Sequence, residues 1–334
     1  MSRSRRSKGQ AVEPLKVALA GTEHGHAVGN PKAAYDSENF EIVCGWEPDD
    51  RRRERFLSQA PWASDLRWEA SLEMMLEQEP LDAVLVETCN AESLRVAELA
   101  VQAGCHVWLD KPAGDDFHHY SAIMAEAERR GLVIQMGYMF RTHPGFERAS
   151  ALARNGDLGQ VFMIRAHMST DNVQEMRTQI STHRGGILYD LGGHMVDQIV
   201  RIVGRPLEVN SYFEKVVPTD ELMDNTVCVM RFKGGGLAVI TIAAQEVQPV
   251  ARRFEVHGSN GSAILEPFEP VATVRIRQRG DSEEIREEHE FRERYDEVMD
   301  LFAHAVRTGE RLRSPEHDLL VQETLMRAAG ALVN

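Results

Sequence analysis

In the first half of the chain, short apolar stretches alternate with segments whose apolar residues recur at helical spacing. The apolar stretches predict strands at 15–20, 40–44, 82–86, 106–109 and 132–136. The segments between them predict helices at 26–35, 49–59, 71–78, 92–103 and 116–130. Strands that alternate with helices of about 10–15 residues form parallel βαβ units. We therefore predict a doubly wound α/β domain whose parallel sheet is covered on both faces.

After Gly159 strand-like segments dominate, and most of them follow one another with no predicted helix between them. They lie at 161–168, 207–217, 226–232, 237–244, 253–257, 263–266 and 271–277. Turn-forming clusters at 233–236 and 258–261 separate two pairs of them. Runs of strands of this kind indicate an antiparallel sheet. We interpret the charged stretch 281–297 as a solvated loop that leads into a helix, and we predict a closing helix at 316–332.

Length and composition fit a globular protein with two domains. The chain has 334 residues, of which 43% are hydrophobic and 27% are charged, and about 150 residues per domain is typical. We divide it into a disordered tail at 1–13, a first domain at 14–137 and a second domain at 138–334. The basic start, MSRSRRSKGQ, lacks the apolar stretch of a secretory or twin-arginine signal.

Charge and cysteine content narrow the class of partner. The net charge of −14 opposes nucleic-acid binding, which needs a basic surface. No apolar run approaches the roughly 20 residues of a membrane span. The four cysteines form no C-x-x-C pair, so we expect reduced thiols and a cytoplasmic location.

A broad sheet usually needs a cover, and we therefore expect a homodimer or homotetramer that pairs through the open face of the second domain's sheet.

The loop after the first strand partly matches a dinucleotide-binding fingerprint. It reads Gly21, Thr22, Glu23, His24, Gly25 and His26. The fingerprint is G-x-G-x-x-G; Gly21 fits its first position, while Glu23 and His26 replace the other two glycines. A loop that enters a helix still offers free N–H groups to a phosphate, although an ordinary turn has the same form. His24 and His26 could hold a metal, but no third ligand lies nearby in the sequence, so we expect none.

The loops after the later strands supply further candidates, because a doubly wound sheet binds its ligand beyond the carboxyl ends of its strands. Glu47 follows the second strand, where an acidic residue would bind the adenosine ribose. That placement favours NAD and leaves NADP possible, since arginines at 51–53 could compensate. The third and fourth loops contribute Thr88, Cys89, Asn90, Asp110 and Lys111. Lys111 would lie near a nicotinamide, but by spacing alone it could be an ordinary turn lysine.

A predicted helix at 187–203 carries a chemically distinctive face. Asp190, His194 and Asp197 lie on one side of it, at i, i+4 and i+7. Gly192 and Gly193 each cost a helix interior about 1 kcal/mol relative to alanine. That cost suggests either close packing or close approach of a ligand. Without further information, a capped helix with a satisfied histidine remains the alternative.

Five segments, in a fixed order, carry a family resemblance. They are LDKPAG at 109–114, GYMFRTHP at 137–144, NGDLGQV at 155–161, GGILYDLGGHMVD at 185–197 and VHGSNGSAILE at 256–266. Together they resemble the Gfo/Idh/MocA family of oxidoreductases, with Asp110 in place of the glutamate of its E-K-P segment. The resemblance covers roughly residues 14–334. It implies a dinucleotide-binding Rossmann domain, then an α/β substrate and oligomerisation domain with a large, open, mainly antiparallel sheet.

The resemblance also implies NAD(P) binding and redox chemistry at a carbinol carbon, often of a sugar or polyol. It places the catalytic lysine on Lys111 and the catalytic aspartate and histidine on Asp190 and His194. In the resulting hypothesis, the cofactor supplies the hydride chemistry and Lys111 stabilises developing alkoxide charge. His194, with an unperturbed pKa near 6.5, would take the hydroxyl proton, and Asp190 would orient both. Which of Lys111 and His194 takes the proton stays open.

Substrate contacts are expected from segments that face the nicotinamide. The candidates are Tyr138, Arg141, His143 and Arg184, with Asp171, Asn172, Arg177 and His183 in the same polar segment as Arg184. Two other functions remain open: an NAD-dependent glycosidase, which oxidises and re-reduces its cofactor in one cycle, and a non-catalytic sensor of NAD or a sugar. The unusual loop at Glu23 favours the sensor, whereas the complete catalytic set favours an enzyme.

Overall fold

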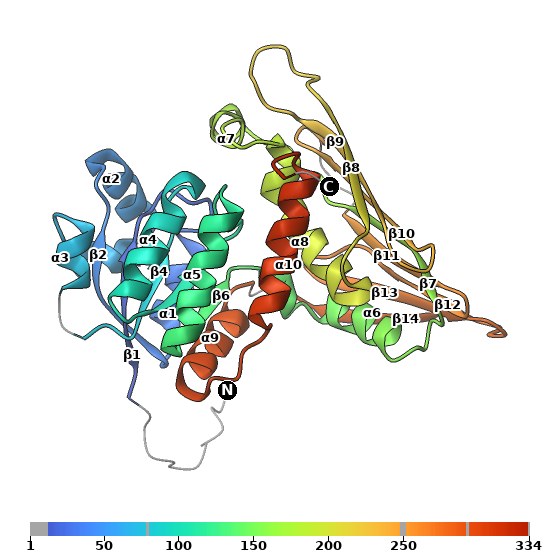
Figure 1. Cartoon of the computed structure of the whole chain (residues 1–334), viewed down its shortest axis with the longest axis horizontal. Helices are drawn as coiled ribbons and strands as arrows, with labels where there is room; N and C mark the ends of the chain where they lie inside the picture. The colour runs from blue at the N-terminus through green and yellow to red at the C-terminus, as the bar shows by residue number, and fades with distance from the viewer. Residues whose placement is uncertain (1–12, 78–79, 248–251, 292–293, 333–334) are drawn as a thin grey trace.

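The computed structural model describes residues 13–77, 80–247, 252–291 and 294–332. Two lobes lie side by side, each built on one sheet, and helices of the second lobe stand between the two sheets (Figure 1). The tail expected at 1–13 lies outside the described residues, apart from Glu13.

The first lobe contains a six-stranded parallel sheet in the order β3-β2-β1-β4-β5-β6. Its strands are β1 (Leu15–Ala20), β2 (Phe40–Trp46), β3 (Arg67–Trp68), β4 (Ala83–Val86), β5 (His106–Leu109) and β6 (Ile134–Met136). This is the strand order of dinucleotide-binding folds, and the order reverses beside β1, where such sheets bind their ligand. The predicted fold of this half is therefore confirmed. Strand β3 escaped prediction because a two-residue strand carries no periodicity.

Helices cover both faces of this sheet, close to the predicted ranges. They are α1 (Gly29–Asp36), α2 (Asp50–Gln59), α3 (Leu72–Leu76), α4 (Asn90–Gln102) and α5 (Phe117–Arg130), with short 3-10 turns at Pro61–Asp65 and Met139–Arg141. Helix α1 begins later than expected because residues 24–28 form turns. In these turns the N–H groups of Ala27 and Gly29 donate to the carbonyl oxygens of His24 and His26.

Helix α9 (Asp296–Thr308) returns to the first lobe and changes the expected domain boundary. Val298, Met299 and Phe302 are buried in the same apolar cluster as β1 and β2. The Phe302 ring stacks on Phe40 and meets Trp108 edge-on, with centroids 6.2 and 5.9 Å apart. The second domain is therefore not simply residues 138–334, because part of its sequence completes the core of the first.

The second lobe contains an eight-stranded sheet in the order β14-β13-β12-β11-β7-β10-β9-β8. Its strands are β7 (Val161–His167), β8 (Glu208–Glu214), β9 (Asn225–Arg231), β10 (Leu237–Ala243), β11 (Arg253–Gly258), β12 (Gly261–Leu265), β13 (Val271–Gln278) and β14 (Ile285–Glu290). Only the β7–β10 pairing among them is parallel, so the predicted mainly antiparallel sheet is confirmed. The helices are α6 (Pro144–Arg154), α7 (Gln174–Ile180), α8 (Gly186–Val203) and α10 (Pro315–Ala328).

Strand β14 corrects the interpretation of 281–297 as a loop. Its residues IREEHE pair with β13 in register from Ile276–Ile285 to Val271–Glu290. Both of its faces carry charged side chains, and this hides the alternation that normally marks a strand. One of those charges is used inside the lobe: Glu287 accepts two hydrogen bonds from Arg148 of α6.

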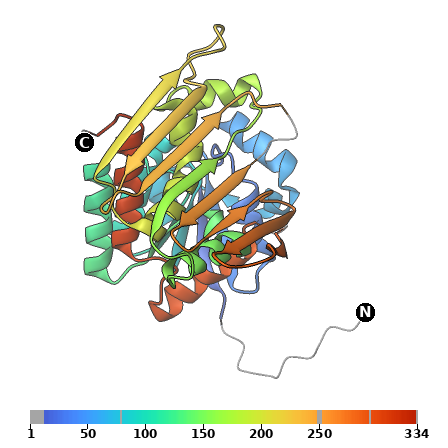
Figure 2. The same cartoon turned by 90° about the vertical axis from the view of Figure 1, so that its right-hand side faces the viewer.

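The second sheet is covered on one face only. Helices α6, α8 and α10 lie on the side of the first lobe, and Figure 2 looks onto the opposite, open face. Along β10, Ala238, Ile240 and Ile242 point into the core, whereas Leu237 and Val239 face outward. On α8, a Cβ atom at Gly193 would lie 2.9 Å from the Tyr138 hydroxyl. Close packing, rather than ligand approach, therefore accounts for that helical glycine.

Candidate active site

The two lobes meet at Lys111, the second residue after β5. Its side chain is buried, and Nζ donates to the backbone carbonyl of Asp190 at 2.9 Å and lies 3.4 Å from the Asp190 carboxylate. Asp190 belongs to the first turns of α8, which is part of the other lobe. The structure thus joins two of the three expected catalytic residues across the interface between the lobes.

Burial and neighbouring charges set the protonation states of Asp190 and His194. Burial raises the pKa of the Asp190 carboxyl, but the positive charge of Lys111, followed by that of His24, outweighs it, so the pKa lies below its usual value. Burial, reinforced by Lys111, holds the pKa of His194 well below 6.5. Asp190 is therefore ionised and His194 neutral at pH 7. The unperturbed value near 6.5 does not apply to the pKa of this ring, because the sequence does not reveal how deeply the ring is buried.

His194 lies one turn along α8 from Asp190. Its ring packs edge-on against Tyr138 and beside Phe140, with centroids 5.6 and 5.1 Å away. Its Nδ1 is buried without a hydrogen-bond partner in the part of the chain that the structure describes. Burying a nitrogen without a hydrogen-bond partner costs about 1–3 kcal/mol. A catalytic role is one explanation for a protein that keeps such a group.

Two more polar residues border the same interface. Asn90, the first residue of α4, donates its amide N–H to Nε2 of His183 at 3.2 Å. Burial lowers the pKa of His183, although Asp190 partly opposes the shift. Asn90 and His183 thus link the third loop of the first lobe to the segment before α8. Both were candidates from the sequence, and the structure brings them together. Arg184 is exposed in the turn that follows, and its role stays a prediction.

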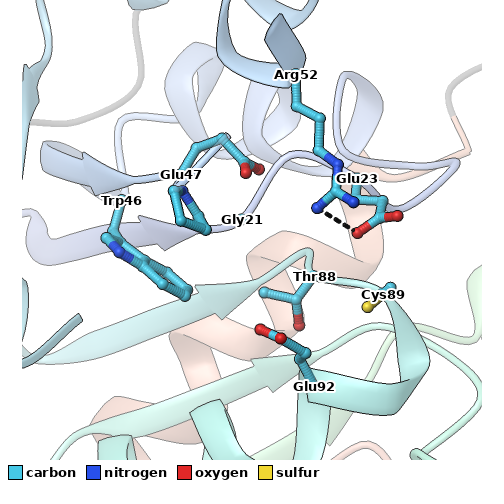
Figure 3. Close-up of a pocket in the computed structure, with 9 residues that line it drawn as sticks. Gly21, Glu23, Trp46, Glu47, Arg52, Thr88, Cys89 and Glu92 are labelled. Atoms are coloured by element: carbon cyan, nitrogen blue, oxygen red, sulfur yellow. Dashed lines mark ion pairs between the residues drawn. The ribbon is translucent and has the colours of Figure 1, made fainter. Parts of the chain in front are cut away.

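A pocket opens beyond β1, β2 and β4, and Figure 3 shows its lining. The residues are Gly21, Glu23, Trp46, Glu47, Pro48, Arg52, Thr88, Cys89 and Glu92. Gly21 has φ +82°, and a Cβ atom there would lie 2.4 Å from the Thr88 side chain. Glycine is therefore required at this position on two grounds. The pocket lies at the reversal of strand order, where three of the predicted cofactor loops converge.

The unusual Glu23 is paired rather than free. Its carboxylate lies 2.7 Å from the guanidinium of Arg52, which reaches across the pocket from α2 (Figure 3). Glu47 is nearly fully buried and accepts hydrogen bonds from the N–H and hydroxyl of Thr22, both at 2.8 Å. The Glu47 carboxylate thus holds the loop in place through Thr22, and Arg52 compensates the charge of the Glu23 carboxylate.

Behind Lys111 lies a cluster that the sequence did not predict. Oδ2 of Asp110 is 2.7 Å from Nδ1 of His24 and 3.0 Å from Nδ1 of His26. Asn30 of α1 donates to Asp110 and to Glu87, both at 2.9 Å. Burial raises the pKa of Asp110, but the two histidines outweigh it and hold the pKa well below its usual range. Burial and the charge of Asp110 hold the pKa of Glu87 well above its usual range.

Asn30 and Glu87 were missed as members of this cluster. Glu87 directly follows the buried strand β4, and a carboxylate at such a strand end is a usable signal. Asn30 lies within the helix α1 and carries no signal of its own. His24 was expected to contact the cofactor, and the structure turns its ring toward Asp110.

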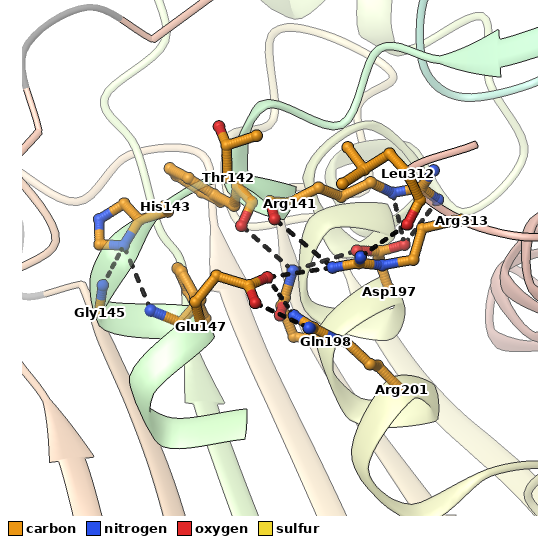
Figure 4. Close-up of polar contacts among 12 residues, drawn as sticks. Arg141, Thr142, His143, Gly145, Glu147, Asp197, Gln198, Arg201, Leu312 and Arg313 are labelled. Atoms are coloured by element: carbon orange, nitrogen blue, oxygen red, sulfur yellow. Dashed lines mark hydrogen bonds and ion pairs between the residues drawn. The ribbon is translucent and has the colours of Figure 1, made fainter. Parts of the chain in front are cut away.

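Three residues expected to contact the substrate lie in the interior of this structure, and that role stays a prediction. Arg141 is 1% exposed, and its guanidinium binds Asp197 at 2.7 Å (Figure 4). It also binds Asp318. His143 caps α6: its Nδ1 accepts the N–H groups at the helix start, and its Nε2 donates to the carbonyl of Phe268. Tyr138 is 2% exposed and packs against His194 and Arg141. Sequence position alone does not distinguish such residues from ligand contacts.

Other charged residues of the polar segment are also committed to structure. Arg177 of α7 is buried and binds Asp220 at 2.6 Å and Asp224 at 2.8 Å. It is therefore not available to bind a carboxylate or phosphate of a ligand. Asp197, on the same helix face as His194, belongs to the Arg141 network and also lies 2.9 Å from His317.

Comparison with known proteins identifies both halves of the chain. The family model GFO_IDH_MocA, described as an oxidoreductase family with an NAD-binding Rossmann fold, matches residues 15–138, and a GFO/IDH/MocA C-terminal domain model matches residues 146–264. An uncharacterized oxidoreductase, YrbE, from Bacillus subtilis is 27% identical over 270 residues, 76% of each chain. Myo-inositol 2-dehydrogenase from Thermotoga maritima is 26% identical over 245 residues, 71% of this chain and 72% of that one.

Solved structures share the whole fold at low sequence identity. A 3-ketoreductase from Actinomadura kijaniata, in complex with NADP and TDP-benzene, superposes with a TM-score of 0.80 and 21% identity. The match covers 94% of this chain and 96% of that one. Both lobes, and not only the nucleotide-binding half, are therefore common to the two proteins.

Proposed function

Because the chain belongs to the Gfo/Idh/MocA family of NAD(P)-binding oxidoreductases, we propose that it transfers hydride between a nicotinamide and the carbinol carbon of a sugar, polyol or related small molecule. The observation that carries this proposal is the buried contact between Lys111 and Asp190 across the two lobes. Relatives support the substrate class, since they include a myo-inositol dehydrogenase and sugar reductases.

The residues of the pocket fit a dinucleotide. Gly21 lets the first loop pack directly against Thr88. Arg52 compensates the charge of Glu23, so a diphosphate would not face an unpaired carboxylate. Glu47 lies where it would repel a 2′-phosphate, and we therefore propose NAD as the preferred cofactor, with NADP possible. Gly21, Thr22, Glu23, Gly25, Glu47, Thr88, Cys89 and Asn90 would border it. When bound, the cofactor supplies the hydride chemistry at C4 of its nicotinamide.

The catalytic residues then have separate tasks. The Lys111 ammonium would donate to the substrate oxygen and stabilise negative charge that develops on it. The ionised Asp190 holds that ammonium in place. His194, neutral at pH 7, has a nitrogen lone pair free to accept the hydroxyl proton. Burial of Lys111 and His194 keeps water from competing for these contacts.

Loss of Lys111 or His194 tests this assignment. We expect Lys111→Ala and His194→Ala each to lower kcat by about 100-fold or more, with cofactor affinity, measured by nicotinamide fluorescence, nearly unchanged. Lys233→Ala, an exposed turn lysine of the second sheet, is the matched control. Near-normal turnover of a sugar and polyol panel by either variant would remove its assigned role. Glycoside cleavage without net NADH formation would replace the proposal with the glycosidase alternative.

We also propose that two or more copies pair through the open face of the second sheet. Apolar side chains on that face, including Tyr212, Val229 and Val239, support this. A cytoplasmic location is proposed as well, supported by four cysteines that form no disulfide. None of the helices in the described part of the chain is long and apolar enough to cross a membrane.

A further inference from the structure

His24, His26 and Asp110 form a compact group where the first loop faces the end of β5. Each residue offers one ligand-type atom, and all three atoms lie within 4.8 Å of one another. We propose that this group binds one divalent ion of a first-row transition metal, of the class of Zn²⁺ or Mn²⁺. The site is separate from the hydride chemistry proposed above and does not depend on it.

The close contact between His24 and Asp110 needs a positive charge, which either a second ring proton or a metal ion can supply. Its Nε2 lies 3.0 Å from the carbonyl oxygen of Lys111, and a carbonyl can only accept, so Nε2 carries the hydrogen. In the neutral ring, Nδ1 then bears a lone pair. That lone pair lies 2.7 Å from a carboxylate oxygen of Asp110. Nδ1 also accepts the His26 N–H at 3.2 Å. Two lone pairs 2.7 Å apart repel each other, so the contact with Asp110 needs either a second proton on the His24 ring or a bound metal ion in place of that proton.

The arrangement of His24 matches that of a metal ligand. A ligating imidazole usually donates its other N–H to a backbone carbonyl or a carboxylate, which fixes the ring. His24 makes this contact with the carbonyl of the residue after Asp110, so the loop and the strand end are already aligned. Asp110 is fixed in turn: the Lys111 N–H donates to its Oδ1 at 2.7 Å, and Asn30 donates to its Oδ2.

Two of the three ligand-atom spacings are close to those of octahedral coordination, which Mn²⁺ adopts more readily than Zn²⁺. Two ligand atoms about 2.1 Å from a metal and about 90° apart lie about 3.0 Å from each other. The distances from Asp110 Oδ2 to Nδ1 of His24 and His26 are 2.7 and 3.0 Å. Two imidazoles and one carboxylate form a set typical of Zn²⁺, Fe²⁺ and Mn²⁺ rather than of Mg²⁺ or Ca²⁺.

A second carboxylate provides an independent indication. Glu87 is fully buried, and its Oε2 lacks a hydrogen-bond partner in the described part of the chain. That oxygen lies 3.7 Å from Nδ1 of His24, directed at the same group. Without a metal, burial and the charge of Asp110 raise the pKa of Glu87 and keep this carboxyl protonated. A divalent ion would displace that proton and take Glu87 as a fourth ligand.

The sequence position explains why this group exists here and not in an ordinary dinucleotide loop. His26 replaces the third glycine of the fingerprint, whose usual purpose is close packing of the helix on the sheet. Here the turns at 24–28 delay the start of α1, and the imidazole occupies the space beneath it. Tyr295, which precedes α9, packs against the His26 ring with centroids 5.6 Å apart. A bound ion would hold the loop against the residue that precedes Lys111.

The test measures metal binding by the full-length protein, without substrate or nicotinamide. After dialysis against excess Zn²⁺ or Mn²⁺ and removal of free metal, mass spectrometry of the digested protein should find about one ion per chain. His26→Ala and Asp110→Asn should each weaken the affinity for Zn²⁺, measured by chelator competition, by roughly 100-fold or more. His304→Ala, an exposed histidine of α9 that contacts Glu310, is the matched control and should bind as the wild type does.

Two further measurements guard against a misleading variant. His26→Gln is the milder substitution, and circular dichroism should confirm that each variant is folded. Binding of Co²⁺ to the wild type should give visible ligand-field absorption that His24→Ala abolishes. Less than about 0.1 ion per chain, unchanged affinity in folded variants, or a doubly protonated His24 seen by NMR in excess Zn²⁺ would overturn the proposal. Because none of these readouts is turnover, failure here would leave the proposed oxidoreductase function untouched.

Discussion

Some buried polar residues at the junction of the lobes bind other parts of the chain rather than the proposed active site. His143 illustrates this, because a histidine at the domain junction has the expected chemistry of a substrate contact. Its Nδ1 instead accepts the N–H groups of Gly145 and Phe146 at 3.1 and 3.3 Å. This cap requires an unprotonated nitrogen, and burial accordingly lowers the pKa of His143 to about 4.

The cap makes stability depend on pH in a predictable direction. Below the unfolded pKa of 6.5, the unfolded chain binds a proton that folded His143 does not take up until about pH 4. Stability should therefore fall as the pH drops from 6.5 to about 4, by up to about 3 kcal/mol from this residue. His143→Asn keeps a side chain that can cap the helix but does not titrate. Urea unfolding across this range should show a shallower pH dependence for the variant; equal slopes would contradict the assignment.

At the scale of elements, the helix α9 is the clearest departure from the order of the sequence. It follows the last strand of the second sheet yet packs on β1, β2 and β5 of the first. Its apolar face recurs at helical spacing, but periodicity says only that a face is buried, not against what. The two lobes are thereby joined at both ends of the second lobe, which restricts how they can separate.

A substitution in α9 should therefore destabilise the first lobe. Phe302→Ala removes a fully buried ring that contacts Phe40 and Trp108, and we expect a loss of about 3–5 kcal/mol in unfolding free energy. Hydrogen exchange should rise in β1 and β2 more than in β9 and β10. Phe162→Ala, which truncates an exposed ring of the second sheet, is the control and should change stability little. A uniform rise across both sheets would argue against α9 as part of the first core.

At the scale of the whole molecule, the open sheet face is the main surface left without a cover by the described chain. Tyr212 pairs with Val227 across β8 and β9, and Val229 pairs with Val239 across β9 and β10. These outward side chains make one half of the face apolar. Toward β11 the face becomes ionic, with Glu255 close to Arg165 and His257. A second copy of the chain could bury the apolar half of the face and form ion pairs with the charged residues of the other half.

Assembly through this face is tested by charge. Light scattering of the wild type should give a dimer or tetramer, since about 800 Å² per partner suffices for a stable interface. Val229→Asp places a carboxylate in the centre of the apolar half and should shift the protein toward monomer. Met74→Asp adds the same charge at an exposed apolar residue of the other lobe and should leave the assembly intact. A wild type that stays monomeric would reject the proposed interface.

Local pattern was sufficient for much of the fold. Apolar runs and helical spacing located most strands of both lobes and the helices α1 to α5, α8 and α10, because burial on one or two faces of an element is encoded in adjacent residues. They did not locate α6 and α7. The segments around Lys111 and His194 also carried a family resemblance, which the comparisons confirm. The short strand β3 and the charged strand β14 escaped, because one lacks length and the other lacks alternation.

The sequence by itself determined the fold class, the oxidoreductase family and the candidates Lys111, Asp190 and His194. Only the tertiary structure decided which polar residues face one another: Arg141 turned to Asp197, Arg52 to Glu23, and Asp110 to two histidines far away in the chain. It also decided protonation, since the pKa of His194 follows from burial and from a lysine on the other lobe. Burial and charge contacts depend on long-range packing, and no local spacing of residues encodes them.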